Sequence, residues 1–111
     1  MRRSTDLIDQ EVEPLAGTFR LLSDKTRLKI LLLLTSGERN VSSLCQELAL
    51  PQPTVSHHLG LLRMQNLISN RRSGKQVFYG LGGHVNPSEG GIGLEINVDQ
   101  FALKITNRLG V

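Results

Sequence analysis

The fold is decided by the stretch LPQPTVSHHLGLLRMQ at residues 50–65. Its two prolines, Pro51 and Pro53, interrupt any continuous helix, because proline has no N–H and restricts the residue before it. Pro53 suits the first turn of a new helix, which we expect to run to about Gln65. In that helix, three apolar residues recur at i, i+4 and i+7: Val55, Leu59 and Leu62. The opposite face is small, polar and free of acid, so it is suited to lie against a flat, narrow partner.

Three helices are predicted before this stretch. Helical spacing of apolar residues indicates a first helix from about Glu13 to Leu22. Asp24 is expected to cap a second, leucine-rich helix from Lys25 to about residue 35, which would be buried nearly all round. Ser42 is the candidate cap of a short third helix over residues 43–48.

Two hairpins are predicted after it. Extended stretches flank Ser73-Gly74-Lys75 and indicate a β-hairpin with a cationic tip. A glycine-rich loop follows Tyr79. Apolar residues then alternate over residues 92–98 and 101–105, which indicates a second hairpin. Residues 92–109 also fit helical spacing; the β-branched residues among them favour strands, and both readings stay open.

Composition and charge limit the function. At 111 residues the chain fits one domain, with a flexible tail over residues 1–10 and a glycine-rich loop and C-terminal extension over residues 83–111 packed on the rest. The longest apolar run is five residues, too short to span a membrane, and a single cysteine, Cys45, excludes an intrachain disulfide; both suit the cytoplasm. From Leu48 to Ser88 there is no Asp or Glu, which indicates a polyanionic partner.

The order of elements is that of a winged helix-turn-helix over residues 11–82, in an α+β, mostly helical fold. A major groove admits one α-helix, and a basic hairpin adds contacts to the phosphate backbone beside it. Double-stranded DNA is therefore the expected partner, and no catalytic constellation is recognisable. The expected DNA-binding residues are Gln52, Thr54, Ser56 and His57, which would read bases, with Arg63 and the wing cations Arg71, Arg72 and Lys75.

Three blocks in the correct order resemble the ArsR/SmtB family of bacterial repressors. They are residues 22–31 (LSDKTRLKIL), residues 51–63 (PQPTVSHHLGLLR) and residues 72–79 (RSGKQVFY), within roughly residues 14–81. The resemblance implies a homodimeric transcriptional repressor that binds an inverted-repeat operator and that an effector usually releases. Val12, Leu15 and Phe19, with the C-terminal segment, are candidates for the dimer contact.

The chain departs from this family where many members hold a metal. Asn40 and Ser42 stand where the family's metal-binding cysteines would be, so we expect no metal or other cofactor and leave the effector open. His57 and His58 are adjacent and diverge by about 100° on a helix, which disfavours a shared ion; His58 is expected to be packed and hydrogen-bonded. Cys45 is expected to be a packing residue. Two alternatives remain open: a winged-helix module that binds a protein, and a sensor with a non-standard metal or redox site.

Overall fold

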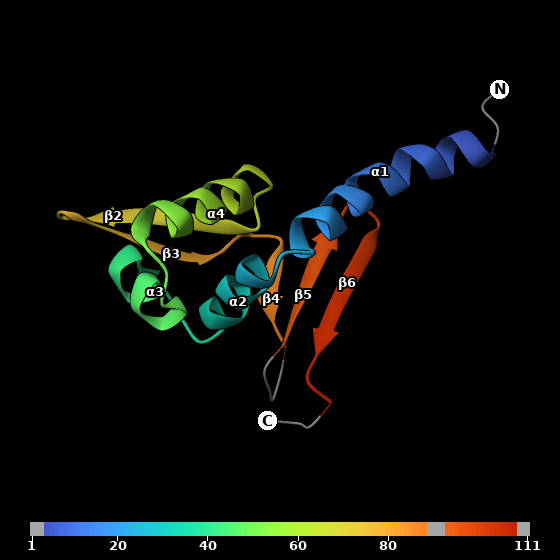
Figure 1. The fold of residues 1–111 in the computed structure, drawn as a ribbon. Coiled ribbons are helices and arrows are strands. Elements are labelled where there is room, and N and C mark those ends of the chain that lie inside the picture. The colour runs from blue at the N-terminus through green and yellow to red at the C-terminus, as the bar shows by residue number, and fades with distance from the viewer. Residues whose placement is uncertain (1–3, 89–92, 109–111) are drawn as a thin grey trace.

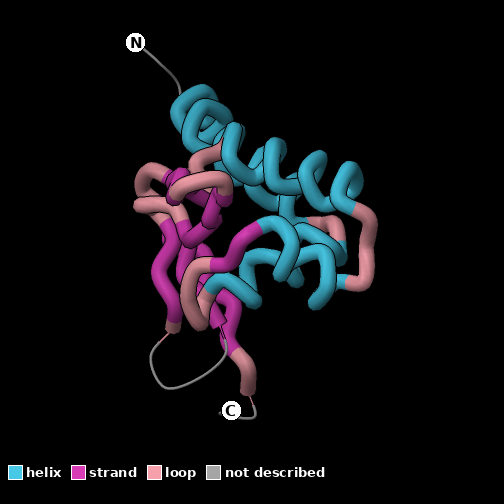
Figure 2. The backbone as a smooth tube through the Cα atoms, turned by 90° about the vertical axis from the view of Figure 1, so that its left-hand side faces the viewer, coloured by secondary structure: helices cyan, strands magenta, loops and turns pink. Residues whose placement is uncertain are grey.

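A computed structural model describes residues 4–88 and 93–108 of the chain. Its helices are α1 (Ser4–Leu22), α2 (Lys25–Leu34), α3 (Val41–Leu48) and α4 (Gln52–Met64). Its strands are β1 (Arg39–Asn40), β2 (Ile68–Ser73), β3 (Gln76–Leu81), β4 (Val85–Pro87), β5 (Gly93–Val98) and β6 (Phe101–Thr106). The strands form two three-stranded antiparallel sheets, ordered β1-β3-β2 and β4-β5-β6 (Figure 1). Helices and strands gather on separate sides of the molecule, which confirms the α+β winged-helix prediction (Figure 2).

The caps of α2 and α3 fix where these helices begin. The Asp24 side chain accepts a hydrogen bond from the Arg27 N–H at 3.1 Å, as predicted for the start of α2. The predicted cap of α3 was wrong: Asn40, not Ser42, accepts the Ser43 N–H, at 2.8 Å. Asn40 has the extended backbone that a cap position needs because it is also the last residue of β1. Ser42 lies inside the helix.

Helix α1 is longer than the sequence indicated. It begins at Ser4, so residues 4–10, expected to belong to a polar tail, form its first turns. Pro14 lies inside the helix instead of at its start, and the Thr18 hydroxyl donates to the Pro14 carbonyl at 3.1 Å. The N-terminal half extends away from the other elements (Figure 1).

One core joins both halves of the chain. Residues Ile30, Leu31, Leu44, Leu59 and Leu62 of the helices are fully buried together with Leu94 and Ile96 of β5. The second predicted hairpin is confirmed as β5 and β6, which Asp99 and Gln100 connect; the predictions at Ile92 and Leu109 lie outside the described residues. The short strand β4 was missed, because three residues in a glycine-rich stretch carry too little alternation to reveal a strand.

Candidate nucleic-acid interface

Helix α4 presents a polar surface to solvent. Val55, Leu59 and Leu62 are buried, as their spacing predicted. The side chains expected to contact DNA from this helix are all exposed: Gln52, Thr54, Ser56, His57 and Arg63. The apolar side of the helix therefore packs on the core, and its polar side is available to a partner.

The N-terminus of α4 is open as well. Pro51 is its cap residue and provides no side-chain hydrogen bond, although its carbonyl accepts the N–H groups of Thr54 and Val55 at 3.1 and 3.2 Å. No acidic residue lies in the first turn. Such a helix start favours an anion, because the helix dipole and the first N–H groups carry partial positive charge.

The predicted wing is confirmed as the hairpin of β2 and β3. Ser73 pairs with Gln76 across a turn in which Gly74 has a φ of 62°, a left-handed conformation that favours glycine. Arg72 and Lys75 are exposed near this turn. The wing thus carries these two cations to the end of the sheet.

Arg71, the third wing cation, forms an ion pair within the protein. Its Nε donates to both carboxylate oxygens of Glu38, at 2.9 and 3.0 Å, and its Nη2 lies 2.8 Å from Oε1. The guanidinium carbon also lies 4.8 Å from the centre of the Phe78 ring. The hydrogen bond and the charge of Glu38 raise the pKa of Arg71 above its ordinary value. Glu38 was missed from the sequence, because it lies outside the acid-free region and reaches the wing only through the pairing of β1 with β3.

The Glu38 side chain passes next to Gly80 on its way to Arg71. A Cβ atom added to Gly80 would lie 3.3 Å from the Glu38 Cγ, so the carboxylate side chain passes close to this part of the central strand β3. Ser69 pairs with Gly80 and Arg71 with Phe78, which places Arg71 and Gly80 on the same face of the sheet. The absence of a side chain at Gly80 leaves room for the ion pair.

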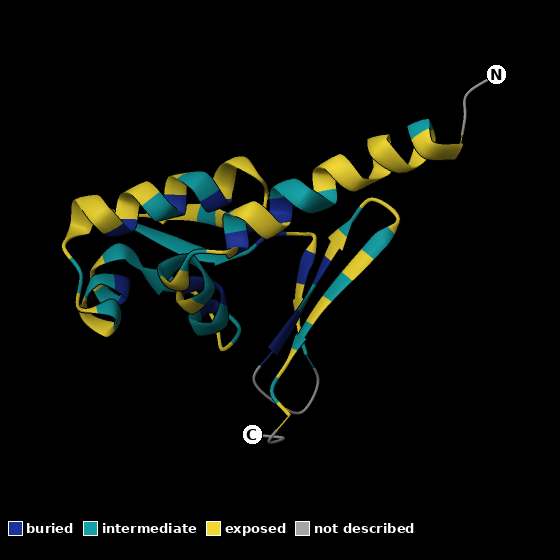
Figure 3. Ribbon diagram, turned by 45° about the vertical axis from the view of Figure 1, so that its right-hand side comes forward, coloured by how far each residue is buried: buried dark blue, intermediate teal, exposed yellow. Residues whose placement is uncertain are grey.

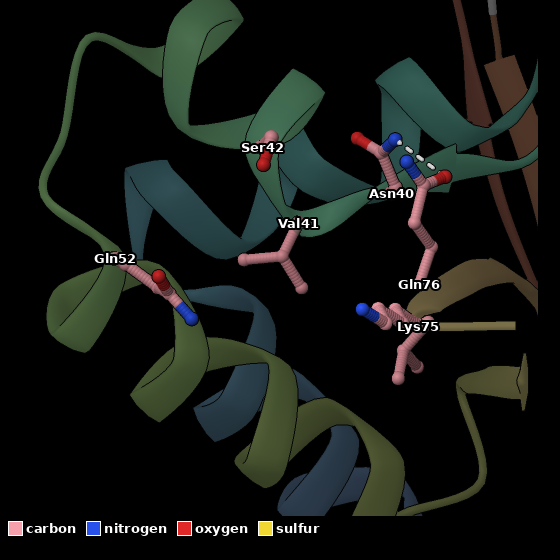
Figure 4. Close-up of a pocket in the computed structure, with 7 residues that line it drawn as sticks. Asn40, Val41, Ser42, Gln52, Lys75 and Gln76 are labelled. Carbon is pink, nitrogen blue, oxygen red and sulfur yellow. Dashed lines mark hydrogen bonds between the residues drawn. The ribbon is translucent and has the colours of Figure 1, made fainter.

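A hollow of about 220 Å³ connects the start of α3, the start of α4 and the wing. Seven residues line it: Asn40, Val41, Ser42, Gln52, Lys75, Gln76 and Val77. The Asn40 amide donates to the Gln76 side chain at 3.3 Å and ties β1 to the wing (Figure 4). Gln52 and Lys75 enter this hollow from α4 and from the wing turn, so the structure brings together two site residues that the sequence placed 23 positions apart.

The inner side of α4 is held to α2 by polar contacts. The Nδ1 atom of His58 lies 3.5 Å from Arg27 Nη1 and 3.9 Å from Asp24 Oδ1, and its side chain is mostly buried. This confirms the packed imidazole expected at His58. The Arg27 N–H, followed by the charges of His58 and Arg27, lowers the pKa of Asp24, while partial burial opposes this shift.

The remaining residues that could bind a metal or react with an oxidant do not form a site in the described part of the chain. Cys45 is half-buried and packs against the core. Among residues 4–88 and 93–108, no three His, Cys, Asp or Glu side chains are grouped so that they could hold a metal ion. None of the helices described is long and apolar enough to cross a bilayer.

Comparison with known proteins agrees with this geometry. Residues 24–70 match the family model described as bacterial regulatory protein, arsR family. The arsenical resistance operon repressor of Escherichia coli is 47% identical over 68 residues, which cover 60% of this chain and 58% of that protein. The transcriptional repressor SdpR of Bacillus subtilis is 36% identical over 65 residues, which cover 59% of this chain and 72% of that protein.

A solved structure shares the fold. It is the homodimeric winged helix-turn-helix DNA-binding domain of Mb0332 from Mycobacterium bovis, described as a possible ArsR-family transcriptional regulator. The two share 31% identity with a TM-score of 0.61, over 75% of this chain and 73% of that one. The chain spans only 58% of the length of the first curated relatives that it matches. The E. coli and B. subtilis relatives are named as repressors and not as enzymes.

Proposed function

Since this chain belongs to the ArsR family of bacterial regulatory proteins, we propose that it is a transcriptional repressor that binds double-stranded DNA as a homodimer. The operator would be an inverted repeat, in keeping with the two-fold symmetry of the dimer. The protein would act in the cytoplasm, where bacterial DNA lies. The E. coli and B. subtilis relatives are both named repressors, which supports the direction of the regulation.

The observation that carries this proposal is the hollow between α3, α4 and the wing. Gln52, at the first turn of α4, and Lys75, at the wing turn, line the same concave surface. A helix placed in a major groove would bring Lys75 to the flanking phosphates at the same time. One rigid surface then provides base contacts and backbone contacts together.

The residues divide by chemistry. Gln52, Thr54, Ser56 and His57 carry amide, hydroxyl and imidazole groups that suit base edges, where a good bidentate contact contributes about 1–3 kcal/mol of discrimination. Arg63, Arg72 and Lys75 are exposed cations suited to phosphates. Arg71 belongs to the same set, but it has to exchange Glu38 for a phosphate to act in this way.

In the proposed dimer, each α4 enters one of two successive major grooves about 34–36 Å apart. Val12, Leu15 and Phe19 on α1 and the C-terminal segment provide the dimer contact. The part of this surface that α1 provides is apolar and exposed: the exposed fraction is 41% for Val12 and 52% for Phe19. An apolar helix face left uncovered in this way favours a protein partner.

We also propose that this repressor lacks the family's cysteine metal site. Asn40 and Ser42 occupy the corresponding positions, and Asn40 is committed to capping α3. Titration of Zn(II), As(III) or peroxide into a preformed DNA complex should therefore leave the complex intact. Release of DNA by any of the three would show a non-standard metal or redox site.

Fluorescence anisotropy tests DNA binding directly. The probe is a duplex from upstream of the chain's own gene, titrated at several salt concentrations against a duplex of scrambled sequence. We expect tighter binding to the upstream duplex and a logarithm of affinity that falls linearly with the logarithm of salt concentration. Binding that is absent, or that salt does not change, would reject the proposal in favour of a protein-binding winged helix.

A further inference from the structure

A groove of about 510 Å³ lies between α2 and α3, which pack against each other (Figure 1). Seven residues line it: Lys29, Leu32, Leu33, Thr35, Ser36, Glu47 and Leu48. None of them belongs to the residues proposed to bind DNA or to form the dimer contact. The groove is therefore a surface that the proposed function does not use.

The floor of the groove is apolar. Leu32, Leu33 and Leu48 pack against the core but are only half-buried, so part of each side chain remains exposed. Figure 3 shows such half-buried stretches in teal on both α2 and α3. Binding sites for small molecules are usually about 300–1,000 Å³ in volume and lined mostly by apolar side chains. The size and lining of this groove are those of such a site.

Only one of the polar groups in the groove is free to bind a charged ligand. The hydroxyls of Thr35 and Ser36 already donate to backbone carbonyls of α2, at 2.5 and 3.1 Å. The Glu47 carboxylate accepts a hydrogen bond from Arg39 Nε at 2.7 Å. Lys29 is exposed and forms no hydrogen bond or ion pair within residues 4–88 and 93–108. A ligand in the groove would therefore meet one unpaired positive charge.

Lys29 lies at one end of the apolar floor. Lys29, Leu33 and Ser36 recur at i, i+4 and i+7, so they follow one face of α2. At a rise of about 1.5 Å per residue, Lys29 and Ser36 are about 10 Å apart along the helix axis. A ligand that matches this arrangement carries a negative group at one end and an apolar chain or ring system about 10 Å long.

We propose that the groove binds a small apolar carboxylate and that this ligand weakens DNA binding. Its carboxylate group contacts Lys29, and its hydrocarbon part covers the three leucines. This inference rests on the proposed function, and it names the chemical class of the effector.

Helix α3 couples the groove to the proposed DNA interface. Its last turn, with Glu47 and Leu48, lines the groove, whereas its first turn, with Val41 and Ser42, lines the hollow next to α4 and the wing. A ligand that moves α3 away from α2 therefore also changes the hollow. Because that hollow provides base and backbone contacts together in the proposed complex, its displacement lowers the affinity for DNA.

Calorimetric titration without DNA tests the site itself. The chain is titrated with octanoate, with octanol as the uncharged analogue and with acetate as a carboxylate without the apolar chain. We expect octanoate to bind at least tenfold more tightly than either. Lys29→Gln should weaken octanoate binding about tenfold and leave octanol binding unchanged. Lys25→Gln is the matched control, because Lys25 is an exposed cation one turn earlier on α2 that does not line the groove.

Amide NMR spectra locate the ligand without any substitution. Octanoate should shift the resonances of the residues that line the groove, and acetate should not. Shifts confined to other parts of the chain would reject this site.

Anisotropy titrations with the upstream duplex test the coupling. Saturating octanoate should weaken DNA binding about fivefold or more, whereas acetate at the same concentration, which adds the same ionic strength, should not. Lys29→Gln should bind DNA as the wild type does without octanoate and should not respond at the octanoate concentration that saturates the wild type.

The outcomes separate this inference from the function on which it rests. A wild-type chain that does not bind the upstream duplex in the absence of octanoate rejects the proposed function. Octanoate that does not bind, or that binds Lys29→Gln as tightly as the wild type, rejects the groove as a carboxylate site. Octanoate that binds in the groove and leaves the DNA affinity unchanged rejects its role as an effector, and the DNA-binding proposal stands.

Discussion

The Nη2 atom of Arg71 lies 2.8 Å from Oε1 of Glu38, so the protein's own carboxylate already neutralises one of the three wing cations. In the proposed complex with DNA, Glu38 would compete with a phosphate for the Arg71 guanidinium. Both side chains of the pair are exposed to solvent, and surface ion pairs of this kind contribute little to stability. Its effect should therefore be seen in DNA binding more than in folding.

We predict that Glu38→Gln strengthens DNA binding. Loss of the carboxylate frees Arg71 for a phosphate, so the slope of log affinity against log salt should steepen by about one. Anisotropy titrations at several salt concentrations measure this slope. Glu47→Gln, which removes the carboxylate that accepts from Arg39, is the control and should leave the slope unchanged. A flatter slope for Glu38→Gln would show that the pair holds the wing in place for binding.

We predict that wing and helix variants affect DNA binding differently. Arg72→Ala should weaken binding to all sequences by a similar factor and reduce the salt slope by about one, because a phosphate contact carries no sequence information. Gln52→Ala and His57→Ala should instead change the preferred sequence, by about 1–3 kcal/mol at individual base pairs. Selection from a randomised duplex library measures both. If Arg72→Ala changed the preferred sequence while Gln52→Ala and His57→Ala weakened binding to all sequences equally, the assignment of phosphate and base contacts would be wrong.

We predict that Gly82→Ala destabilises the fold. A Cβ at Gly82 would collide with the backbone carbonyl oxygen of Asn66, which no side-chain rotation can relieve. We expect a loss of more than about 2 kcal/mol in the free energy of unfolding, measured with urea. Gly83→Ala is the matched control, since no atom outside its two chain neighbours lies within 4 Å of its added Cβ. Equal stability of the two variants would contradict the close approach of the chain at Asn66.

We predict that the stabilising effect of Asp24 depends on pH. Its pKa in the folded protein is lowered from the ordinary value of 3.8, so its charged form stabilises the fold above that value and the stabilisation is lost as pH falls through the lowered pKa. At neutral pH, Asp24→Ala should cost about 1 kcal/mol by removing the cap of α2. The difference between wild type and variant should shrink below about pH 4 in urea unfolding. A difference independent of pH would show that the charge adds nothing to the cap.

The sequence predicted the winged helix well because its signals are local. The spacing of Val55, Leu59 and Leu62 and the prolines before them determine α4, and the Asp24 cap determines α2. For residues 92–109 both alternation and helical spacing fitted; the β-branched residues favoured strands, and β5 and β6 confirm that choice. In each case, neighbours in the chain provide the interaction that decides the structure.

The features that the sequence did not predict depend mostly on residues far apart in the chain. The ion pair of Arg71 with Glu38 spans 33 positions and exists because β1 pairs with β3. Asn40 replaces Ser42 as a cap because the same sheet extends its backbone. The length of α1 was underestimated because Pro14 was placed at the helix start, although it lies within the helix. The roles of the exposed α4 and wing residues in DNA binding remain predictions.

Leu94 and Ile96 are buried in the same core cluster as the leucines of α2, which has a practical consequence for protein engineering. A shortened chain that ends after the wing would leave the helical layer with a bare hydrophobic side, and it would tend to aggregate in place of binding DNA. A chimera with another regulator should therefore exchange only the exposed side chains of α4 and keep the helices and the C-terminal strands from one parent.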